Sequence, residues 1–284
     1  MMEANQYEPK PEILELNQLA QRIRTEIGKV IVGQEQLVDL VLTGLLCDGH
    51  ILVEGVPGVA KTLAAKLVAR IIQVRFSRLQ FTPDMMPSDV VGTAIFNPGK
   101  GGFDFKAGPV FSNIVLIDEI NRAPAKTQSA LFEVMEERQV TSDGQTRTLP
   151  DPFFVIATQN PSRQIGTFPL PESQLDRFLM RISLGYPDRS SERLLLAGED
   201  RRDAIGRLQP VMTPDELRGL MAVVPQVHAS DALLDYLQAL IAATRSGQWF
   251  VDGMSPRAGI AVLRLARARA LLNGRDHVTP DDLQ

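Results

Sequence analysis

The sequence has one cysteine, three histidines and no long apolar run, and these absences exclude several kinds of protein. Cys47 alone cannot form an intrachain disulfide, and its setting is typical of a helix core in a reducing compartment. His50, His228 and His277 are too scattered to build a common zinc cluster with one cysteine. The N-terminus lacks the basic and apolar segments of a secretory signal, and no apolar run reaches the ~18 residues that span a bilayer. We therefore expect a soluble, cytoplasmic protein.

The sequence also has no large excess of charge of either sign. The formal net charge of −4 gives no overall field that would attract nucleic acid or an anionic membrane. The apolar share of 44% and the charged share of 23% are ordinary for a soluble globular protein. A chain of 284 residues exceeds the usual size of one core, so we expect a larger and a smaller domain.

Apolar runs of strand length alternate with helical patterns through the first two thirds of the chain. This alternation predicts a parallel sheet that is covered by helices on both faces. A polar tail is expected at residues 1–11. The predicted strands lie at 50–54, 75–81, 114–117, 153–158 and 180–184, and the predicted helices at 13–27, 34–47, 62–72, 126–137 and 174–178.

Two stretches interrupt the alternation and predict hairpins. The first spans residues 92–111 and carries a turn rich in glycine and proline. The second spans Gln139 to Thr148, where Asp143-Gly144 suits a two-residue turn between short polar strands.

After Pro187 only helical patterns follow, so we predict a domain boundary there. Thr213, followed by proline and then Glu216 at the third helical position, forms a capping box. Further helices are predicted at 231–244 and 256–272. Residues 279–284 have the pattern of another helix start with no helix behind it, so we expect the small helical domain at 187–284 to be truncated.

The stretch from Gly55 to Thr62 follows a buried strand and precedes a helix, as a phosphate-binding loop does. Glycines let the backbone approach phosphate, Lys61 would reach the β- and γ-phosphates, and the Thr62 hydroxyl would coordinate Mg²⁺. The usual pattern has glycine before the lysine, where this chain has Ala60. The alternative is a glycine-rich strand–helix turn with a chance Lys-Thr.

A second strand, 114–117, ends in the carboxylate pair Asp118-Glu119. Asp118 would belong to the Mg²⁺ shell, and Glu119 would act as general base on the attacking water. A buried strand with a solvated acidic tip is the alternative interpretation, and the phosphate loop upstream argues against it.

A third buried strand ends in polar residues that lead to Asn160, at the sheet edge where ligands bind in open α/β sheets. Asn160 could hold the lytic water or sense the γ-phosphate, although it could also be a turn residue before Pro161. Arg177 and Arg257 are suited to bidentate phosphate contacts. Each could instead be a solvated surface side chain.

These features together resemble the AAA+ ATPases, and specifically their MoxR family. The resemblance rests on the strings GVPGVAKT, QFTPDMMPSDVVGT, NIVLIDEINRAPAKTQSALFEVMEE, FFVIATQNP, LPESQLDRF and GMSPRA, in colinear order from residue 21 to 284. The family commonly has alanine at the position of Ala60. The resemblance implies an αβα P-loop NTPase core at 12–186, with a helix-2 insert and a hairpin before sensor 1, followed by a small helical lid.

The resemblance also implies a role for each matching residue. It implies sensor 1 at Asn160, sensor 2 at Arg257, and at Arg177 an arginine finger that acts on the neighbouring subunit's nucleotide. It places Val32 and Gly33 beside the adenine. The Walker motifs that would hold ATP and Mg²⁺ comprise Gly55, Pro57, Gly58, Val59, Ala60, Lys61, Thr62, Asp118 and Glu119.

Family members form rings, usually hexamers, and act as chaperone-like factors on partners that often carry a von Willebrand factor A domain. The expected function is therefore Mg²⁺-dependent ATP hydrolysis that activates or matures a partner protein. Two alternatives remain: a nucleotide-gated binding protein with little turnover, and a DNA-associated motor. The negative net charge and the lack of a basic, aromatic tract argue against the motor.

Overall fold

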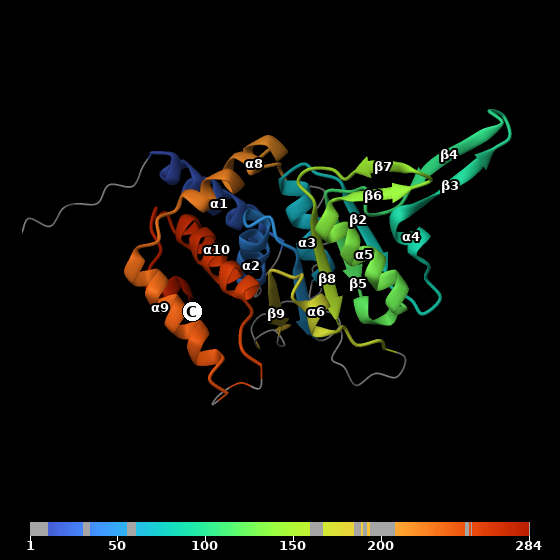
Figure 1. Ribbon diagram of the computed structural model, residues 1–284. Helices are drawn as coiled ribbons and strands as arrows, with labels where there is room; N and C mark the ends of the chain where they lie inside the picture. Colours follow the sequence, from blue (N-terminus) through green and yellow to red (C-terminus); the bar gives the residue numbers. More distant parts are fainter. Residues whose placement is uncertain are drawn as a thin grey trace, which may run out of the picture.

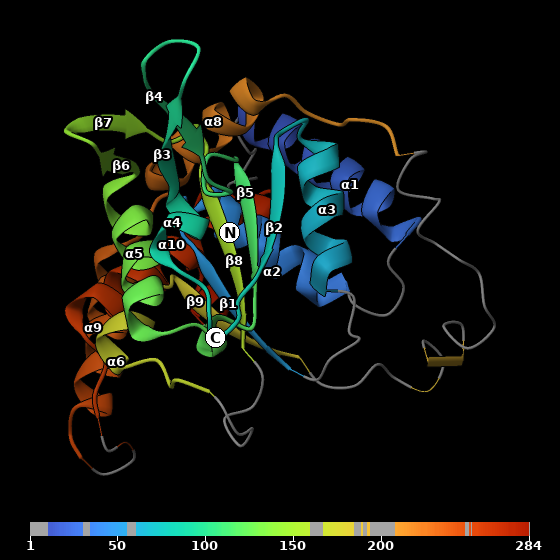
Figure 2. The ribbon, with the colours of Figure 1, turned by 90° about the vertical axis from the view of Figure 1, so that its right-hand side faces the viewer.

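A five-stranded parallel sheet forms the centre of the protein (Figures 1 and 2). The computed structural model describes residues 11–30, 35–55, 61–159, 167–184, 189, 192–193, 208–247, 250 and 252–283. All five predicted strands are confirmed. In the order β2-β5-β8-β1-β9 they are Phe76–Gln80, Ile114–Asp118, Phe154–Gln159, Ile51–Gly55 and Met180–Leu184.

The central strands are apolar throughout because both faces of the sheet are covered. Side chains alternate between the two faces, so Val115 and Ile117 face one cluster while Ile114 and Leu116 face the other. Figure 2 shows α5 on one side of the sheet and α1 and α3 on the opposite side. The helices of the first part of the chain are α1 (Pro11–Gly28), α2 (Glu35–Leu46), α3 (Lys61–Ile71), α4 (Pro87–Val91), α5 (Ala125–Glu137) and α6 (Glu172–Leu175).

Two of these helices differ from the sequence-based expectation. The helix predicted at 174–178 lies instead at 172–175, because Phe178 turns inward and joins the apolar cluster around α5. Helix α4 was not predicted, since five residues are too few to show a helical period. A short 3-10 turn, η1 (Ile120–Arg122), follows β5.

Both predicted hairpins are confirmed. The first consists of β3 (Gly92–Asn97) and β4 (Gly102–Ala107) and projects away from the body of the molecule (Figure 1). The second consists of β6 (Gln139–Ser142) and β7 (Gln145–Thr148). Its turn residues have φ of 54° at Asp143 and 71° at Gly144, as a type I′ turn requires. The Arg147 guanidinium lies 4.0 Å from the ring centroid of Phe105 and thereby joins the two hairpins.

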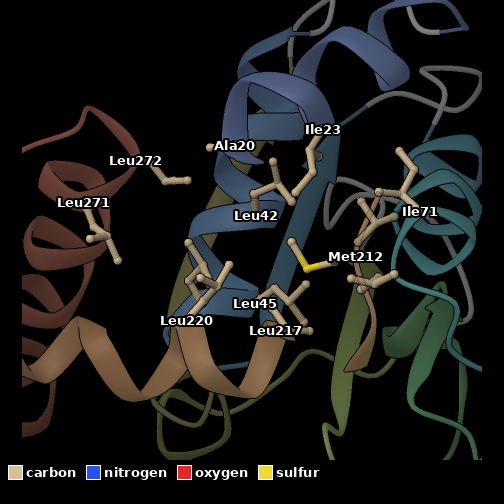
Figure 3. Close-up of a pocket in the computed structure, with 13 residues that line it drawn as sticks. Ala20, Ile23, Leu42, Leu45, Ile71, Met212, Leu217, Leu220, Leu271 and Leu272 are labelled. Carbon is tan, nitrogen blue, oxygen red and sulfur yellow. The ribbon is translucent and has the colours of Figure 1, made fainter. Parts of the chain in front are cut away.

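The helices after residue 208 continue the apolar cluster of α1, α2 and α3. They are α8 (Pro214–Val223), η3 (Val224–Gln226), α9 (Asp231–Thr244), α10 (Pro256–Leu272) and η4 (Pro280–Leu283). The capping box of α8 is confirmed: Thr213 N–H donates to Glu216 and the Glu216 N–H donates to the Thr213 hydroxyl. Leu42, Leu217 and Leu271 surround a small apolar cavity of about 30 Å³ at this junction (Figure 3). The predicted boundary near Pro187 falls outside the described residues and stays a prediction.

None of the helices that the structure describes is both long and apolar enough to cross a bilayer.

His50 is a buried structural residue that connects three elements. Its Nδ1 accepts the Val155 N–H of β8 at 3.0 Å, so the proton must be on Nε2, which lies 3.1 Å from the Met135 carbonyl oxygen of α5. Burial lowers the pKa of His50 to about 4; the Met135 contact opposes this shift and the nearby Arg138 charge adds to it. The neutral ring is therefore part of the folded state.

We expect the free energy of unfolding to fall as the pH is lowered from 7 to 4. Below about 6.5 the unfolded chain binds a proton at His50, whereas the folded chain binds it only near pH 4. The loss from this group is about 1.4 kcal/mol per pH unit across that window. Urea unfolding from pH 7 to 4.5 measures it. The exposed His228 gives the matched control. The free energy of unfolding should still fall with decreasing pH in His228→Gln, and this fall should be smaller in His50→Gln. Equal slopes of unfolding free energy against pH in the two variants would contradict the assignment.

Candidate nucleotide site

Two polar side chains and one backbone N–H meet where β5 and β8 end at their carboxyl edge. Asp118 is the last residue of β5 and is 7% exposed. Thr158, near the end of β8, accepts the Glu119 N–H at its hydroxyl oxygen (3.0 Å) and lies 3.4 Å from Asp118 Oδ1. Register pairing of β8 with β1 sets Thr158 beside Val53, two residues before Gly55. The carboxylate pair and the start of the phosphate loop therefore share one edge of the sheet.

Glu119 has an unusual backbone conformation. Its φ of 56° and ψ of 53° are left-handed, which is uncommon for a residue other than glycine and occurs often at functional sites. This turn carries the chain from β5 into η1. Its carboxylate oxygen Oε2 lies 2.9 Å from Arg122 Nε and 3.1 Å from Gln80 Nε2. Glu119 is thus held by two donors.

Strand β2 contributes two residues that were not predicted from the sequence. Arg78 Nε lies 2.6 Å from Asp118 Oδ2, and Gln80 contacts Glu119. Both residues come from alternate positions of one strand, and β2 pairs with β5 so that Gln80 is opposite Asp118. The signal in the sequence was the polar character of Arg78 and Gln80 within an otherwise plausible strand. It becomes informative only once β2 is known to lie beside β5.

Part of the predicted nucleotide site lies outside the described residues. Gly55 ends β1 with a φ of 151° and pairs in register with Leu184 of β9. Lys61 begins α3, and Thr62 is its second residue, half-buried in the first turn, where free N–H groups and the helix dipole favour an anion. The residues outside the described ranges are Val32, Gly33, Pro57, Gly58, Val59, Ala60 and Asn160.

The two predicted arginines lie at the opposite edge of the sheet. Arg177 precedes β9, and the Leu179 N–H donates to the carbonyl of His50 at the amino end of β1. Arg257 is in the first turn of α10, and its Nη2 lies 3.4 Å from a Glu136 oxygen. Arg177 Nη1 lies 2.6 Å from the other oxygen of the same carboxylate.

A cleft of about 700 Å³ surrounds this pair of arginines. Its cationic lining consists of Arg138, Arg177, Arg181, Arg257 and Arg264. A strand rises about 3.3 Å per residue, so the five residues of β1 hold the cleft and the carboxylate pair on opposite edges of the sheet. The packing of α10 puts Arg257 beside Arg177, so the residues at which the resemblance implies sensor 2 and the arginine finger line the same cleft. The role of Arg257 stays a prediction.

The residues at the carboxyl edge fit a magnesium–nucleotide complex. Hydroxyl and carboxylate oxygens, as at Thr62 and Asp118, are the ligands that Mg²⁺ prefers. Within the part of the chain that the structure describes, Gln159 Oε1 and Asn121 Oδ1 are buried acceptors with no hydrogen-bond partner. Gln159 ends β8 at this edge, and Asn121 follows Glu119 in η1. Such acceptors need a water or ligand donor, which a hydrated metal–phosphate complex supplies.

Comparison with known proteins identifies the family. Residues 50–180 match the family model described as "ATPase family associated with various cellular activities (AAA)", and residues 242–284 match the AAA lid domain. The chain is 45% identical over 270 residues to the uncharacterized protein YeaC of Bacillus subtilis, covering 95% of this chain and 84% of that one. It is also 45% identical over 271 residues to "Chaperone MoxR1" of Mycobacterium tuberculosis, covering 91% and 70% of the two chains. The chain belongs to the MoxR family of AAA ATPases.

A solved structure supports the same assignment. A protein from Cytophaga hutchinsonii that is assigned as an ATPase superposes on this MoxR-family chain with a TM-score of 0.87 and 42% identity, covering 96% of this chain and 85% of that one. The AAA match spans β1 to the start of β9, so it includes both the carboxylate pair and Arg177. Arg257 lies within the lid match.

Proposed function

We propose that this MoxR-family protein hydrolyses ATP at a site shared between two copies of the chain. One observation supports this most strongly: the carboxylates and the arginines occupy opposite edges of the same sheet. A single copy cannot bring them to one nucleotide, whereas a head-to-tail contact between copies can. Repeated head-to-tail contacts close into a ring, and we propose a hexamer.

The chain's own residues divide the chemistry. Lys61 and the loop before it would bind the phosphates, and Asn160 would orient the attacking water. Glu119 would accept that water's proton, because a carboxylate within reach of the nucleophile is suited to general base catalysis. Its two contacts with Arg122 and Gln80 would have to rearrange for this step. The copy next in the ring would supply Arg177 and Arg257, whose charge stabilises the transferring phosphoryl group.

Thr62 and Asp118 would hold the Mg²⁺ shell. The ion, when bound, offsets the negative charge of the phosphates. Arg78 supports this use of Asp118, since its contact at Oδ2 fixes the orientation of the carboxylate.

We further propose that ATP turnover drives the activation or maturation of a partner protein in the cytoplasm. The name of the Mycobacterium tuberculosis relative supports a chaperone role. Family resemblance supports a partner with a von Willebrand factor A domain. The β3–β4 hairpin offers a suitable contact surface, since Phe96 and Phe103 are 54% and 72% exposed at a point that projects from the body (Figure 1).

We expect ATP turnover per chain to rise with protein concentration. Dilution separates the copies and leaves each carboxylate site without Arg177 and Arg257 of a neighbouring copy, so the specific activity of a dilute solution should be low. Phosphate release measured from nanomolar to micromolar protein, alongside the mass in solution, tests this. A specific activity that is constant across that range while the mass changes would contradict the shared site.

A second candidate function is a nucleotide-gated binding protein that rarely turns over. The contacts that hold Glu119 in place favour it. A single-turnover assay with excess protein separates the two: product within minutes supports hydrolysis, and bound but uncleaved ATP supports gated binding.

A further inference from the structure

One carboxylate bridges the two arginines of the cleft. Glu136, in the last turn of α5, contacts Arg177 through Oε2 at 2.6 Å and Arg257 through Oε1 at 3.4 Å. Arg177 belongs to the segment between α6 and β9, and Arg257 to the lid helix α10. The Glu136 side chain is 45% exposed, so it faces the solvent-filled cleft.

The bridge opposes a concentration of positive charge. Two guanidinium groups approach each other here, and Arg257 also lies at the N-terminus of α10, where the helix dipole disfavours a cation. Without an acid between them, these charges would repel one another. Glu136 supplies the compensating charge, and its two oxygens set the spacing of the pair.

The two arginines depend on this bridge to different degrees. Arg177 is also fixed by the Phe132 carbonyl, which accepts from Nη1 at 3.1 Å, and its guanidinium lies 6.0 Å from the Phe132 ring centroid. Arg257 is 60% exposed, and its one described hydrogen bond is to Glu136. A guanidinium has five N–H donors, so both arginines keep donors for an incoming phosphate while Glu136 stays in place.

A second contact holds the lid at the same point. Ser255, which caps α10, donates its hydroxyl to Asp176 Oδ1 at 3.1 Å. Asp176 directly precedes Arg177. The start of α10 is thus attached to the core next to Arg177, and Glu136 completes this attachment by fixing the direction of Arg257.

We infer that Glu136 is a positioning residue that presents Arg177 and Arg257 as a pre-formed pair to the triphosphate of a neighbouring copy. This inference rests on the proposed function of the cleft. The shared carboxylate lowers the net charge of the arginine pair to +1 and fixes the positions of both guanidinium groups. A polyphosphate would therefore meet two cations in fixed geometry rather than two mobile ones.

The test is the turnover of the Glu136→Gln chain at saturating protein concentration. We expect kcat to fall about tenfold, because misplacing a catalytic group by an ångström has effects of this size. KM for ATP should stay within about twofold, since the nucleotide is bound mainly by the other copy. Glu136→Asp, which keeps the carboxylate, should recover part of the loss. Glu137→Gln, an equal charge change at the next, exposed position of α5, should leave kcat unchanged.

A double-mutant cycle separates positioning from a general structural effect. If Glu136 acts through Arg257 as well as Arg177, then Glu136→Gln should cost less in the Arg257→Ala background than in the unaltered chain, because only the Arg177 contact remains to be lost. The inference would be overturned if the kcat losses of the two single variants multiply in the double variant. It would also be overturned if Glu136→Gln turned over ATP as fast as the unaltered chain. The urea midpoints of the same four proteins provide a readout without turnover, and additive midpoints would also overturn it. An unaltered chain without ATP turnover at any concentration would instead refute the proposed function.

Discussion

Replacement of Arg177 by alanine should lower ATP turnover by about 10³-fold or more while leaving nucleotide binding intact. Arginines that stabilise the transferring phosphoryl group contribute on the order of 10³ to 10⁵ in related nucleotide hydrolases. Arg177 lies at the amino edge of the sheet, away from Asp118 and Glu119 of its own chain, so its loss should not disturb the phosphate loop. Phosphate release and the Kd for a fluorescent ATP analogue, measured at the same protein concentration, separate the two effects.

The control for this variant removes an arginine of similar exposure elsewhere. Arg218 on α8 pairs with Asp215 and Asp151, outside the cleft, and Arg218→Ala should keep near-normal turnover. The shared site adds a sharper expectation. Arg177→Ala and Glu119→Gln chains should each be nearly inactive alone, but an equal mixture should regain about a quarter of the turnover, because one in four head-to-tail contacts joins an intact arginine to an intact carboxylate. If the two chains co-assemble and their mixture stays as inactive as each variant alone, the proposal of a site shared between two copies is wrong.

The strands and hairpins of this protein were predictable because their signals are local. Ile114 to Ile117 form a continuous apolar run, as a strand buried on both faces requires. The Asp143-Gly144 pair specifies its own turn. Helix α6 differs from the predicted position because Phe178 packs into a core formed by residues distant in sequence. No local sequence pattern indicates this packing.

The same distinction between local signals and tertiary packing applies to the residues of the candidate site. Asp118 and Glu119 follow a strand, so a parallel sheet puts them at the carboxyl edge, and the sequence was sufficient to predict this. Arg177 precedes a strand, which by the same reasoning assigns it to the amino edge. The position of Arg257 depends on how α10 packs, and the contacts of Arg78 and Gln80 depend on which strand lies beside β5. Both depend on tertiary packing, and the polar character of Arg78 and Gln80 becomes informative only once β2 is known to lie beside β5.

Contacts within the chain hold both halves of the proposed site. At the carboxyl edge, Arg122 and Gln80 contact Glu119, and at the amino edge Glu136 contacts Arg177 and Arg257. Ion pairs at exposed positions contribute only about 0–1 kcal/mol, so rearrangement of the Glu119 contacts on nucleotide binding should cost little. The Glu136 contacts can stay in place, because each guanidinium has further N–H donors for a phosphate.

Replacement of Glu119 by glutamine should lower turnover by about 10²- to 10⁴-fold, the range that a general base contributes. Glutamine keeps the shape and an oxygen acceptor for Arg122 and Gln80, so the strained turn should be preserved, and the variant loses only the ability to take a proton. ATP affinity should change by no more than about threefold, since the phosphates are bound by other groups. Single-turnover measurements with radiolabelled ATP give the chemical step directly. Glu15→Gln, an equal change on the exposed face of α1, is the matched control and should turn over normally. If Glu119→Gln retained more than about a tenth of the normal rate, the proton would have to leave by another route. Glu119 would then have a structural role in the turn after β5 rather than the role of a general base.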